Sequence, residues 1–403
     1  MKIRFNYFLA AFAVMALTMT TVGCKGSDDP SHVDDSSTPD ASEEPEPVTP
    51  GETMDIFDAD GNALGAIDQR AQGAATDAGI LYSVLDLKEY ESTGKATYRF
   101  FRTEDRKDIL MGTLDSQGYE ALFSRTEIGG VIYTLAVSGN VFDSDPDKLW
   151  LLAFNPQKEK MDKVLISDNG FPYTSMAAVG GKLLIMNHEM SSPKYDKVYK
   201  FDPSGGSVKE ILSFDSSENS LRSICADGDG FRLLRVNISE GDKTEVFLDS
   251  YDRNYAKVQE RSIDKLLFTA GCEIDITKED AAKQPLMNVS KTYLSEGRYF
   301  FYENFSTLRT IVDLESESVV LAKNDLWSLS IGSGTPVFYL LFPDDVKGEP
   351  WIYSLQDGKA ESLPLTLPED GKRLESLSFS PSGNCLARLV TSDGSKLIWT
   401  KLQ

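Results

Sequence analysis

The sequence predicts an all-β fold, a seven-bladed β-propeller, over residues 53–403. Three observations carry this prediction: a repeat of about 50 residues, several short alternating strands in each repeat, and a lack of long amphipathic helices. The only helical candidate is Lys278–Gln284. A segment of roughly 350 residues also exceeds one ordinary hydrophobic core, so a repeat or several domains are expected.

The repeat is marked by tight turns that end in glycine and are followed at once by a β-forming run. These glycines are Gly79, Gly130, Gly181, Gly230, Gly297, Gly334 and Gly383. The intervals between them are 51, 51, 49, 67, 37 and 49 residues, and the two unequal intervals together span two repeats. Seven turns predict seven blades, with six or eight as the alternatives because single sequences define strand boundaries poorly.

A second set of apolar runs follows these turns and predicts the next strand of each blade, as in Leu149–Phe154 and Trp351–Leu355. The segment Ile109–Thr113 is either a third or a fourth strand. The chain stops after the third strand of its last repeat, at Lys396–Thr400. We expect Met54–Phe57 to supply the missing fourth strand, which would close the ring and cover its open edges.

The turn Phe379-Ser380-Pro381-Ser382-Gly383 resembles the F-S-P-D-G turn common in WD40-like and TolB-type propellers. Only this repeat carries the motif well, and Ser382 replaces the usual Asp. The resemblance implies the propeller fold for residues 53–403. It says little about function, because propellers host many unrelated activities.

The N-terminal residues 1–23 have the pattern of a secretory signal, since Lys2 and Arg4 precede an apolar run. The run ends in Thr21-Val22-Gly23-Cys24, which resembles the lipobox of bacterial lipoproteins, with Thr21 where Leu is usual. The resemblance implies that Cys24 is acylated and that the mature chain is anchored in the cell envelope. We expect the outer membrane, on its periplasmic side or at the cell surface. An ordinary signal peptide with a chance cysteine is the alternative.

Residues 24–52 are rich in Asp, Glu, Ser, Thr and Pro and predict a disordered, self-repelling tether. Within it, Ser27-Asp28-Asp29 resembles the acidic export signal of surface lipoproteins in Bacteroidetes-type bacteria. A plain spacer is the alternative reading of this segment.

The chain is acidic, with a formal net charge of −22 that becomes −24 when Lys2 and Arg4 leave with the signal peptide. Nucleic-acid binding is therefore disfavoured, because it needs a basic surface that releases counterions from phosphates. Solubility explains the acidity better than a dedicated acidic binding face does.

Residues suited to catalysis are scarce. With only two histidines, His32 and His188, the chain has little from which to build a Ser-His-Asp triad or a multi-histidine metal site. We expect His188 and Glu189 in a loop on one face, with His188 solvated and a general base as the alternative. The remaining candidate binding loops are acidic and could share that face: Asp143, Asp145, Asp147, Asp344 and Asp345.

No metal or cofactor site is predicted. Asp143, Asp145 and Asp147 have the alternate spacing of a calcium loop, but Lys148 and Phe154 stand where such a loop needs Gly and a bidentate acid. The segments Asp58–Asn62 and Asp227–Gly230 fit hairpin turns better than metal loops.

Three cysteines follow Cys24. Cys225, Cys272 and Cys385 are expected to pack as small buried side chains, although Cys225 and Cys272 are one repeat apart and could form a disulfide.

These features favour a binding or scaffold module over an enzyme. The expected partners are membrane lipid, through acylated Cys24, and a protein, glycan or peptide held by the propeller loops. One alternative is a hydrolase or lyase that cleaves polysaccharide with two carboxylates. Another is an accessory role in envelope assembly.

Overall fold

The computed structural model describes the following residues: 53–87, 94–116, 120–138, 147–170, 175–189, 194–238, 244–270, 291–295, 297–303, 308–324, 328–331, 337–341, 351–356, 358–363, 373–392 and 394–401. All of them belong to the second of two units, residues 1–48 and 49–403. Within these ranges, no helix has both the length and the apolar character needed to cross a membrane.

The described strands form seven sheets, which we name A to G. In sheets B, C and D the strands follow chain order: β3 (Gln72–Ala75), β4 (Gly79–Leu87), β5 (Gly94–Arg102), β6 (Lys107–Ser116); β7 (Glu120–Ile128), β8 (Val131–Ser138), β9 (Asp147–Asn155), β10 (Lys160–Gly170); β11 (Ser175–Val179), β12 (Lys182–His188), β13 (Tyr195–Asp202), β14 (Ser207–Asp215).

Sheets E, F and G repeat this order: β15 (Asn219–Asp227), β16 (Gly230–Ile238), β17 (Thr244–Tyr251), β18 (Lys257–Ser262); β19 (Lys291–Ser295), β20 (Tyr299–Glu303), β21 (Leu308–Asp313), β22 (Ser318–Asn324); β23 (Ser328–Ile331), β24 (Val337–Leu341), β25 (Trp351–Gln356), β26 (Lys359–Ser362). Sheet A has the order β2 (Ala63–Asp68), β1 (Thr53–Asp58), β29 (Gly394–Lys401), β28 (Asn384–Thr391), β27 (Arg373–Phe379).

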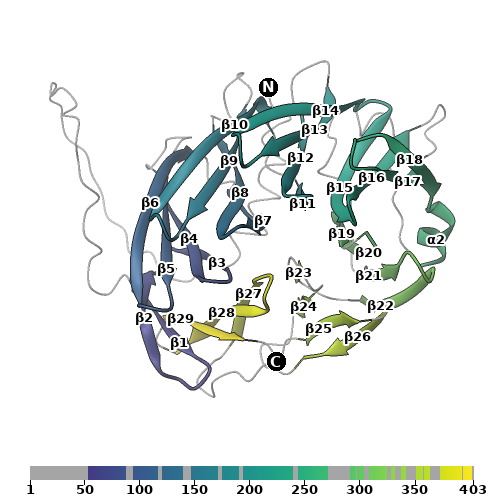
Figure 1. Ribbon diagram of the computed structural model, residues 1–403. Helices are drawn as coiled ribbons and strands as arrows, with labels where there is room; N and C mark the ends of the chain where they lie inside the picture. The colour runs from purple at the N-terminus through teal and green to yellow at the C-terminus, as the bar shows by residue number, and fades with distance from the viewer. Residues whose placement is uncertain are drawn as a thin grey trace, which may run out of the picture. The chain divides into compact units, whose positions relative to one another are not determined.

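The sheets follow one another around a ring, and the strands nearest the centre are β3, β7, β11, β15, β19, β23 and β27 (Figure 1). Contacts between neighbouring sheets run from B through G to A, and β27 contacts β3 to complete the circuit. Each of the seven buried apolar clusters lies between two successive sheets. The predicted all-β propeller is therefore confirmed.

Six of the glycines that marked the repeat, Gly79, Gly130, Gly181, Gly230, Gly297 and Gly383, lie after the innermost strand of a sheet, at or just before the start of the next strand, whereas Gly334 lies outside the described residues. Gly130 and Gly181, for example, have φ angles of 75° and 74°, which a residue with a Cβ adopts at a cost. Ile109–Thr113, ambiguous from sequence, belongs to β6, a fourth strand. The segments Asp58–Asn62 and Asp227–Gly230 are hairpin turns, as expected.

Sheet A is closed by the N-terminal strand, as predicted. The pairing is parallel, and the sheet has five strands where four were expected. Ile56 of β1 lies opposite Leu397 of β29, and β2 adds the fifth strand, which the sequence did not suggest. The side chains of Met54 and Ile56 are at most 1% exposed and pack between sheets A and B. The first strands of the domain therefore complete its last sheet.

The two ends of the sheets differ. At the hairpin end, where first strands turn into second strands and third into fourth, no connection is longer than the one from Tyr251 to Lys257. At the opposite loop end, second strands lead to third strands and each sheet leads to the next. Every longer connection joins strands there, including 88–93, 139–146, 189–194, 342–350 and 363–372.

The longest connection leads from sheet E to sheet F and explains the interval of 67 residues between Gly230 and Gly297. It contains the short helix α2 (Asp264–Thr269), which was not predicted, whereas the helical candidate Lys278–Gln284 lies outside the described residues. Leu267 of α2 packs in the cluster between sheets E and F, and Asp264 Oδ1 accepts a hydrogen bond from Val246 N at 2.7 Å.

Replacement of Ile56 tests the closure by β1. Ile56→Ala removes a fully buried side chain and leaves a cavity between sheets A and B, so it should lower the free energy of unfolding by about 2–5 kcal/mol. Asp55→Ala, at an exposed position of the same strand, should change it by less than about 0.5 kcal/mol. Urea unfolding measures both, and equal losses would contradict the closing role of β1.

Candidate functional site

The structure describes only part of the predicted binding residues. Cys24, Asp143, Asp145, Asp344 and Asp345 lie outside the described residues. Asp147 is the first residue of β9, where it is paired with Gly170 of β10. The chain positions of all the candidate loops nevertheless correspond to second-to-third strand connections, which belong to the loop end of sheets C, D and G.

His188 is not in a solvated loop, which corrects the prediction. It is the last residue of β12 and its side chain is 1% exposed. Strand alternation places it on the same face as Leu184 and Met186, which pack against sheet E. Glu189 follows the strand end, donates its N–H to Tyr195 O, and lies 2.7 Å from Lys197 Nζ through its carboxylate.

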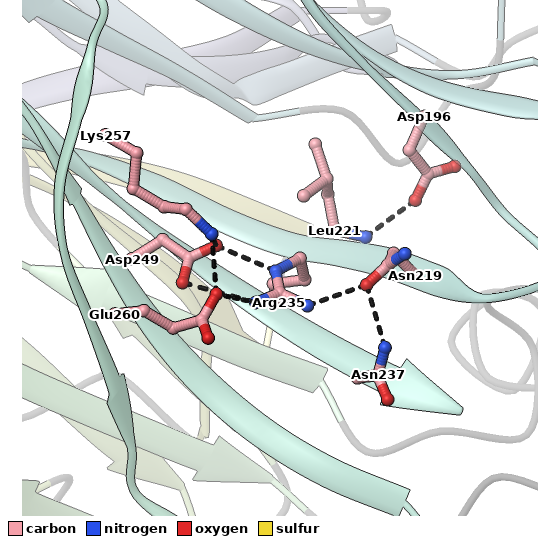
Figure 2. Close-up of polar contacts among 8 residues, drawn as sticks. All are labelled: Asp196, Asn219, Leu221, Arg235, Asn237, Asp249, Lys257 and Glu260. Carbon is pink, nitrogen blue, oxygen red and sulfur yellow. Dashed lines mark hydrogen bonds and ion pairs between the residues drawn. The ribbon is translucent and has the colours of Figure 1, made fainter. Parts of the chain in front are cut away.

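Asp196, opposite His188 in the sheet, is a buried carboxylate with several polar neighbours. His188 Nδ1 lies 2.9 Å from Asp196 Oδ1, although the pair is not well aligned for a hydrogen bond. Ser216 Oγ donates to Oδ1 at 2.8 Å, and Leu221 N donates to Oδ2 at 2.6 Å. Because Leu221 lies in β15, Asp196 connects sheet D to sheet E (Figure 2).

The interface between sheets D and E thus changes character along its length. Toward the hairpin end, Leu184 and Phe231 belong to an apolar cluster. Toward the loop end, the same faces of β12 and β16 carry His188 and Arg235 instead. We call the following residues the polar cluster: His188, Asp196, Ser216, Asn219, Arg235, Asn237, Asp249, Lys257 and Glu260.

Arg235 is the centre of the polar cluster (Figure 2). Its Nε donates to Asp249 Oδ2 at 2.7 Å and its Nη2 to Glu260 Oε2 at 2.9 Å. Its Nη1 donates to Asn219 Oδ1 at 2.6 Å, an oxygen that also accepts from Asn237 Nδ2 at 3.1 Å. These contacts tie β15, β16, β17 and β18 together across the whole of sheet E.

The charges around Arg235 balance. Asp249 is completely buried, so its ionised form needs a nearby cation, and Arg235 supplies one in a two-point contact. Lys257 Nζ lies 2.5 Å from Glu260 Oε2, and this contact holds the pKa of Glu260 below its usual value. Each nitrogen of the Arg235 guanidinium donates at least one hydrogen bond to a strand of sheet E, so the side chain holds these strands together.

A second arginine, Arg222 in β15, is also buried at the same interface. Burial lowers its pKa to about 10, and the negative charge of Asp196 acts in the opposite direction. The guanidinium therefore remains protonated at neutral pH, and its charge offsets that of the buried carboxylate.

The buried cysteines are poor nucleophiles. Cys225 and Cys385 are free thiols, and burial raises the pKa of each to about 12. Both side chains pack in apolar clusters, as predicted. The third cysteine, Cys272, lies outside the described residues. Among the described residues, no group of three or more His, Cys, Asp and Glu side chains is arranged to hold a metal ion.

Sequence reasoning missed the network of Arg235 and Asp249, although the sequence carries a signal for it. Each is a charged residue within an otherwise apolar strand run, Leu233-Leu234-Arg235-Val236 and Val246-Phe247-Leu248-Asp249. A charge in such a position is rarely buried unless it is paired, so two neighbouring strands with opposite charges predict an internal ion pair.

These features define an all-β propeller with a polar loop end.

No protein-family model matches the sequence, and no curated protein matches it. Solved structures match at the level of fold. The acylaminoacyl peptidase of Pyrococcus horikoshii is 13% identical with a TM-score of 0.42; the match covers 69% of this chain and 44% of that chain, so this chain corresponds to less than half of the peptidase.

Two further matches are similar in quality. The β-propeller domain of the Trilobed protease from Pyrococcus furiosus is 12% identical with a TM-score of 0.41, over 69% of this chain and 81% of that chain. An oligogalacturonate lyase from Vibrio parahaemolyticus is 12% identical with a TM-score of 0.44, over 87% and 91%. Identities and TM-scores this low carry no inference about activity, substrate or partner.

Removal of Arg235 should be costly. Arg235→Met removes the cation in direct contact with the buried carboxylate of Asp249 and leaves only Lys257 Nζ, 3.9 Å away, so it should lower the free energy of unfolding by about 3–5 kcal/mol. The double variant Arg235→Met, Asp249→Leu should recover most of that loss. Arg261→Met, which breaks the more exposed pair with Glu317, should cost less than about 1 kcal/mol. If the double variant were no more stable than the single one, burial of an uncompensated charge would not be the cause.

The tautomer of His188 is a second prediction. Because Asp196 lies beside Nδ1, the neutral imidazole should carry its proton on Nδ1 and leave Nε2 bare. Nitrogen-15 NMR can resolve this, since His32 is the only other histidine and His188→Gln assigns the signals. A proton on Nε2 would show that Asp196 does not orient the ring.

Proposed function

We propose that this chain is a lipid-anchored binding module of the bacterial cell envelope, whose propeller holds a protein, glycan or peptide at its loop end. The observation that carries the proposal is the difference between the two ends of the sheets. The hairpin end has only short turns, whereas all the long connections join strands at the loop end. Long connections on a rigid scaffold are where binding residues are usually found.

The polar cluster supports the same assignment by its position. His188, Arg235 and Asn237 lie near the loop-end termini of β12 and β16, and Asp196 at the start of β13 accepts a hydrogen bond from sheet E. Polar contacts therefore hold the strands on either side of the interface beside the 189–194 connection. Polar contacts at the strand termini hold the first and last residues of a connection in place. Less entropy is then lost when a ligand binds.

Anchoring is supported by the N-terminal sequence. Acylation of Cys24 with two or more chains would give stable attachment, at about 0.8 kcal/mol for each buried CH₂ group. The acidic residues 24–52 would hold the propeller away from an anionic surface by charge repulsion. Together these features support a location of the binding module outside the cytoplasm.

The polysaccharide hydrolase or lyase alternative has no specific observation in its favour. Such chemistry needs two accessible carboxylates on either side of a bond. The buried carboxylates of Asp196, Asp249 and Asp313 are each occupied by arginine, hydroxyl or backbone donors. An accessory role in envelope assembly is compatible with a binding module and would appear as a constitutive protein partner.

Affinity purification of the full chain from gently solubilised membranes tests the proposal. We expect a stoichiometric envelope partner that is lost with Cys24→Ala. The double variant Asp344→Asn, Asp345→Asn at the loop end should also lose it, whereas Asp60→Asn in the β1–β2 turn at the hairpin end should not.

If the protein is recovered alone, the same variants are compared on glycan and peptide arrays. Binding that is lost only with the loop-end variant would support a glycan or peptide ligand. Equal loss in both variants, or no binding at all, would contradict assignment of the loop end.

A further inference from the structure

The two ends of the propeller domain lie at opposite ends of sheet A. β28 leads into β29 through the turn Thr391–Gly394, so β29 begins at the loop end and runs to Lys401 at the hairpin end. β1 pairs with β29 in parallel and therefore also begins at the loop end, at Thr53. The chain that precedes Thr53 thus joins the domain at its loop end.

The point of entry at Thr53 is fixed to the sheets. Thr53 is paired with β2, and the side chain of the next residue, Met54, is 1% exposed and packs between sheets A and B. Arg388 of β28 holds the neighbouring connection between β2 and β3, because it donates to Ala71 O at 3.2 Å and to Gln69 O at 3.4 Å. The preceding chain is therefore attached at one defined place on the loop end.

The distance from Cys24 to Thr53 is comparable to the height of the sheets. The 28 residues between them have the composition of a tether. A flexible linker of this length has a root-mean-square span of about 30 Å and reaches about 100 Å when fully extended. The eight residues of β29 rise about 25 Å from the loop end to the hairpin end. The end that the linker joins therefore determines which end of the propeller lies nearer the anchor.

Polar side chains at the hairpin end of sheet A are used to join neighbouring sheets. Arg125 Nη2 of sheet C donates to Ser378 Oγ of sheet A at 2.8 Å. Asp77 Oδ1, in the turn between β3 and β4, accepts from Ser382 N of sheet A at 2.9 Å. The connections at this end are short turns. Contacts that close the ring thus lie at the end opposite to Thr53, and the long connections lie at the same end as Thr53.

We propose that the anchor directs the loop end toward the membrane, and that the partner held there is the extramembrane part of a protein embedded in that same membrane. This inference rests on the proposed function, from which it takes the acylation of Cys24 and the binding role of the loop end. Anchoring in one membrane brings the two proteins within the span of the linker, where the effective concentration is on the order of millimolar. A modest intrinsic affinity is then sufficient for stable association.

The lipid surface itself is a less suitable partner than a protein. The chain has a formal net charge of −22, so an anionic bilayer repels it, whereas a basic protein surface attracts it. Insertion into a bilayer also needs exposed apolar side chains. Among the described residues, the exposed large apolar side chains all lie on the outermost strands of sheets B, C, E and F and none lies in a loop-end connection: Leu110, Leu165, Val258 and Val319.

Energy transfer in vesicles tests the orientation. The full lipidated chain is placed in vesicles of phosphatidylethanolamine and phosphatidylglycerol that carry an acceptor dye on a lipid headgroup. A donor dye is attached at Glu218→Cys or at Asp229→Cys, each in a Cys272→Ser chain. Both positions are exposed, and they lie at opposite ends of β15, about 30 Å apart. The thiols of Cys225 and Cys385 are buried and should not react with the dye.

Transfer from the label at position 218, at the loop end, should exceed that from the label at position 229 by at least about twofold. A matched control carries Cys24→Ala and is anchored through Gln403, by a second copy of residues 25–52 and a terminal histidine tag on nickel-chelating vesicles. Because Lys401 lies at the hairpin end, this control should reverse the order of transfer. Equal transfer from both labels in the lipidated chain, or greater transfer from position 229, would overturn the proposed orientation.

A protease site inserted in residues 25–52 tests where the partner resides. The partner found by affinity purification should stay in isolated envelope membranes after the site is cut and the membranes are washed with alkaline carbonate, which removes peripheral proteins. A chain without the site, treated in the same way, is the control. A partner that leaves the membrane with the released propeller would overturn this inference and leave the proposed function standing. A purification that yields no partner and no array ligand would overturn both.

Discussion

Closure of the ring through β1 and β29 is the constraint on which the rest of the structure depends. Each sheet has apolar side chains on both faces and must be covered by a neighbour on each side. In a ring, that condition is met for the first and last sheets only if they meet. Sheet A satisfies it by combining strands from both ends of the domain, and Ile56 and Leu397 are buried together as a result.

The polar contacts fall into two groups, those that help to close the ring and those that connect strands and sheets elsewhere. At the hairpin end, Arg125 and Asp77 join three sheets where the ring closes. Within sheet E, Arg235 and Asp249 connect neighbouring strands, and nearer the loop end Asp196 connects sheet D to sheet E. Arg235, Asp249 and Asp196 are buried charges that each contact a neighbouring strand or sheet, so the cost of burying them is offset only when the neighbouring part is correctly placed. Such contacts favour one arrangement of the sheets over others of similar apolar burial.

The repeat, the second strand of each sheet and the closing strand could be predicted because local turn chemistry determines them. Gly130 and Gly181 adopt positive φ angles in turns between β-forming runs, and that pattern is visible without any tertiary information. The fifth strand β2 and the helix α2 were missed because Ala63–Asp68 and Asp264–Thr269 are short and acquire their stability from packing against their sheets.

Burial of His188 was mispredicted for a related reason. Its neighbours in sequence, Asn187 and Glu189, are polar and suggest a loop, whereas its neighbours in space are Asp196 of the adjacent strand and the face of sheet E. The burial of His188 thus depends on groups from elsewhere in the chain, the nearby carboxylate of Asp196 and the apolar face of sheet E. A single sequence contains both residues but not their pairing, so local reasoning places them in water.

The two ends of the sheets differ in how freely their sequences can vary while the fold is kept. Contacts that close the ring lie in short hairpin turns, whose glycines and side-chain hydrogen bonds leave little room for substitution. At the loop end, the connection 189–194 leads into β13, where the buried carboxylate of Asp196 accepts a hydrogen bond from sheet E. The end of this connection is therefore fixed by a contact within the sheets, and loop length can vary there at a small entropic cost.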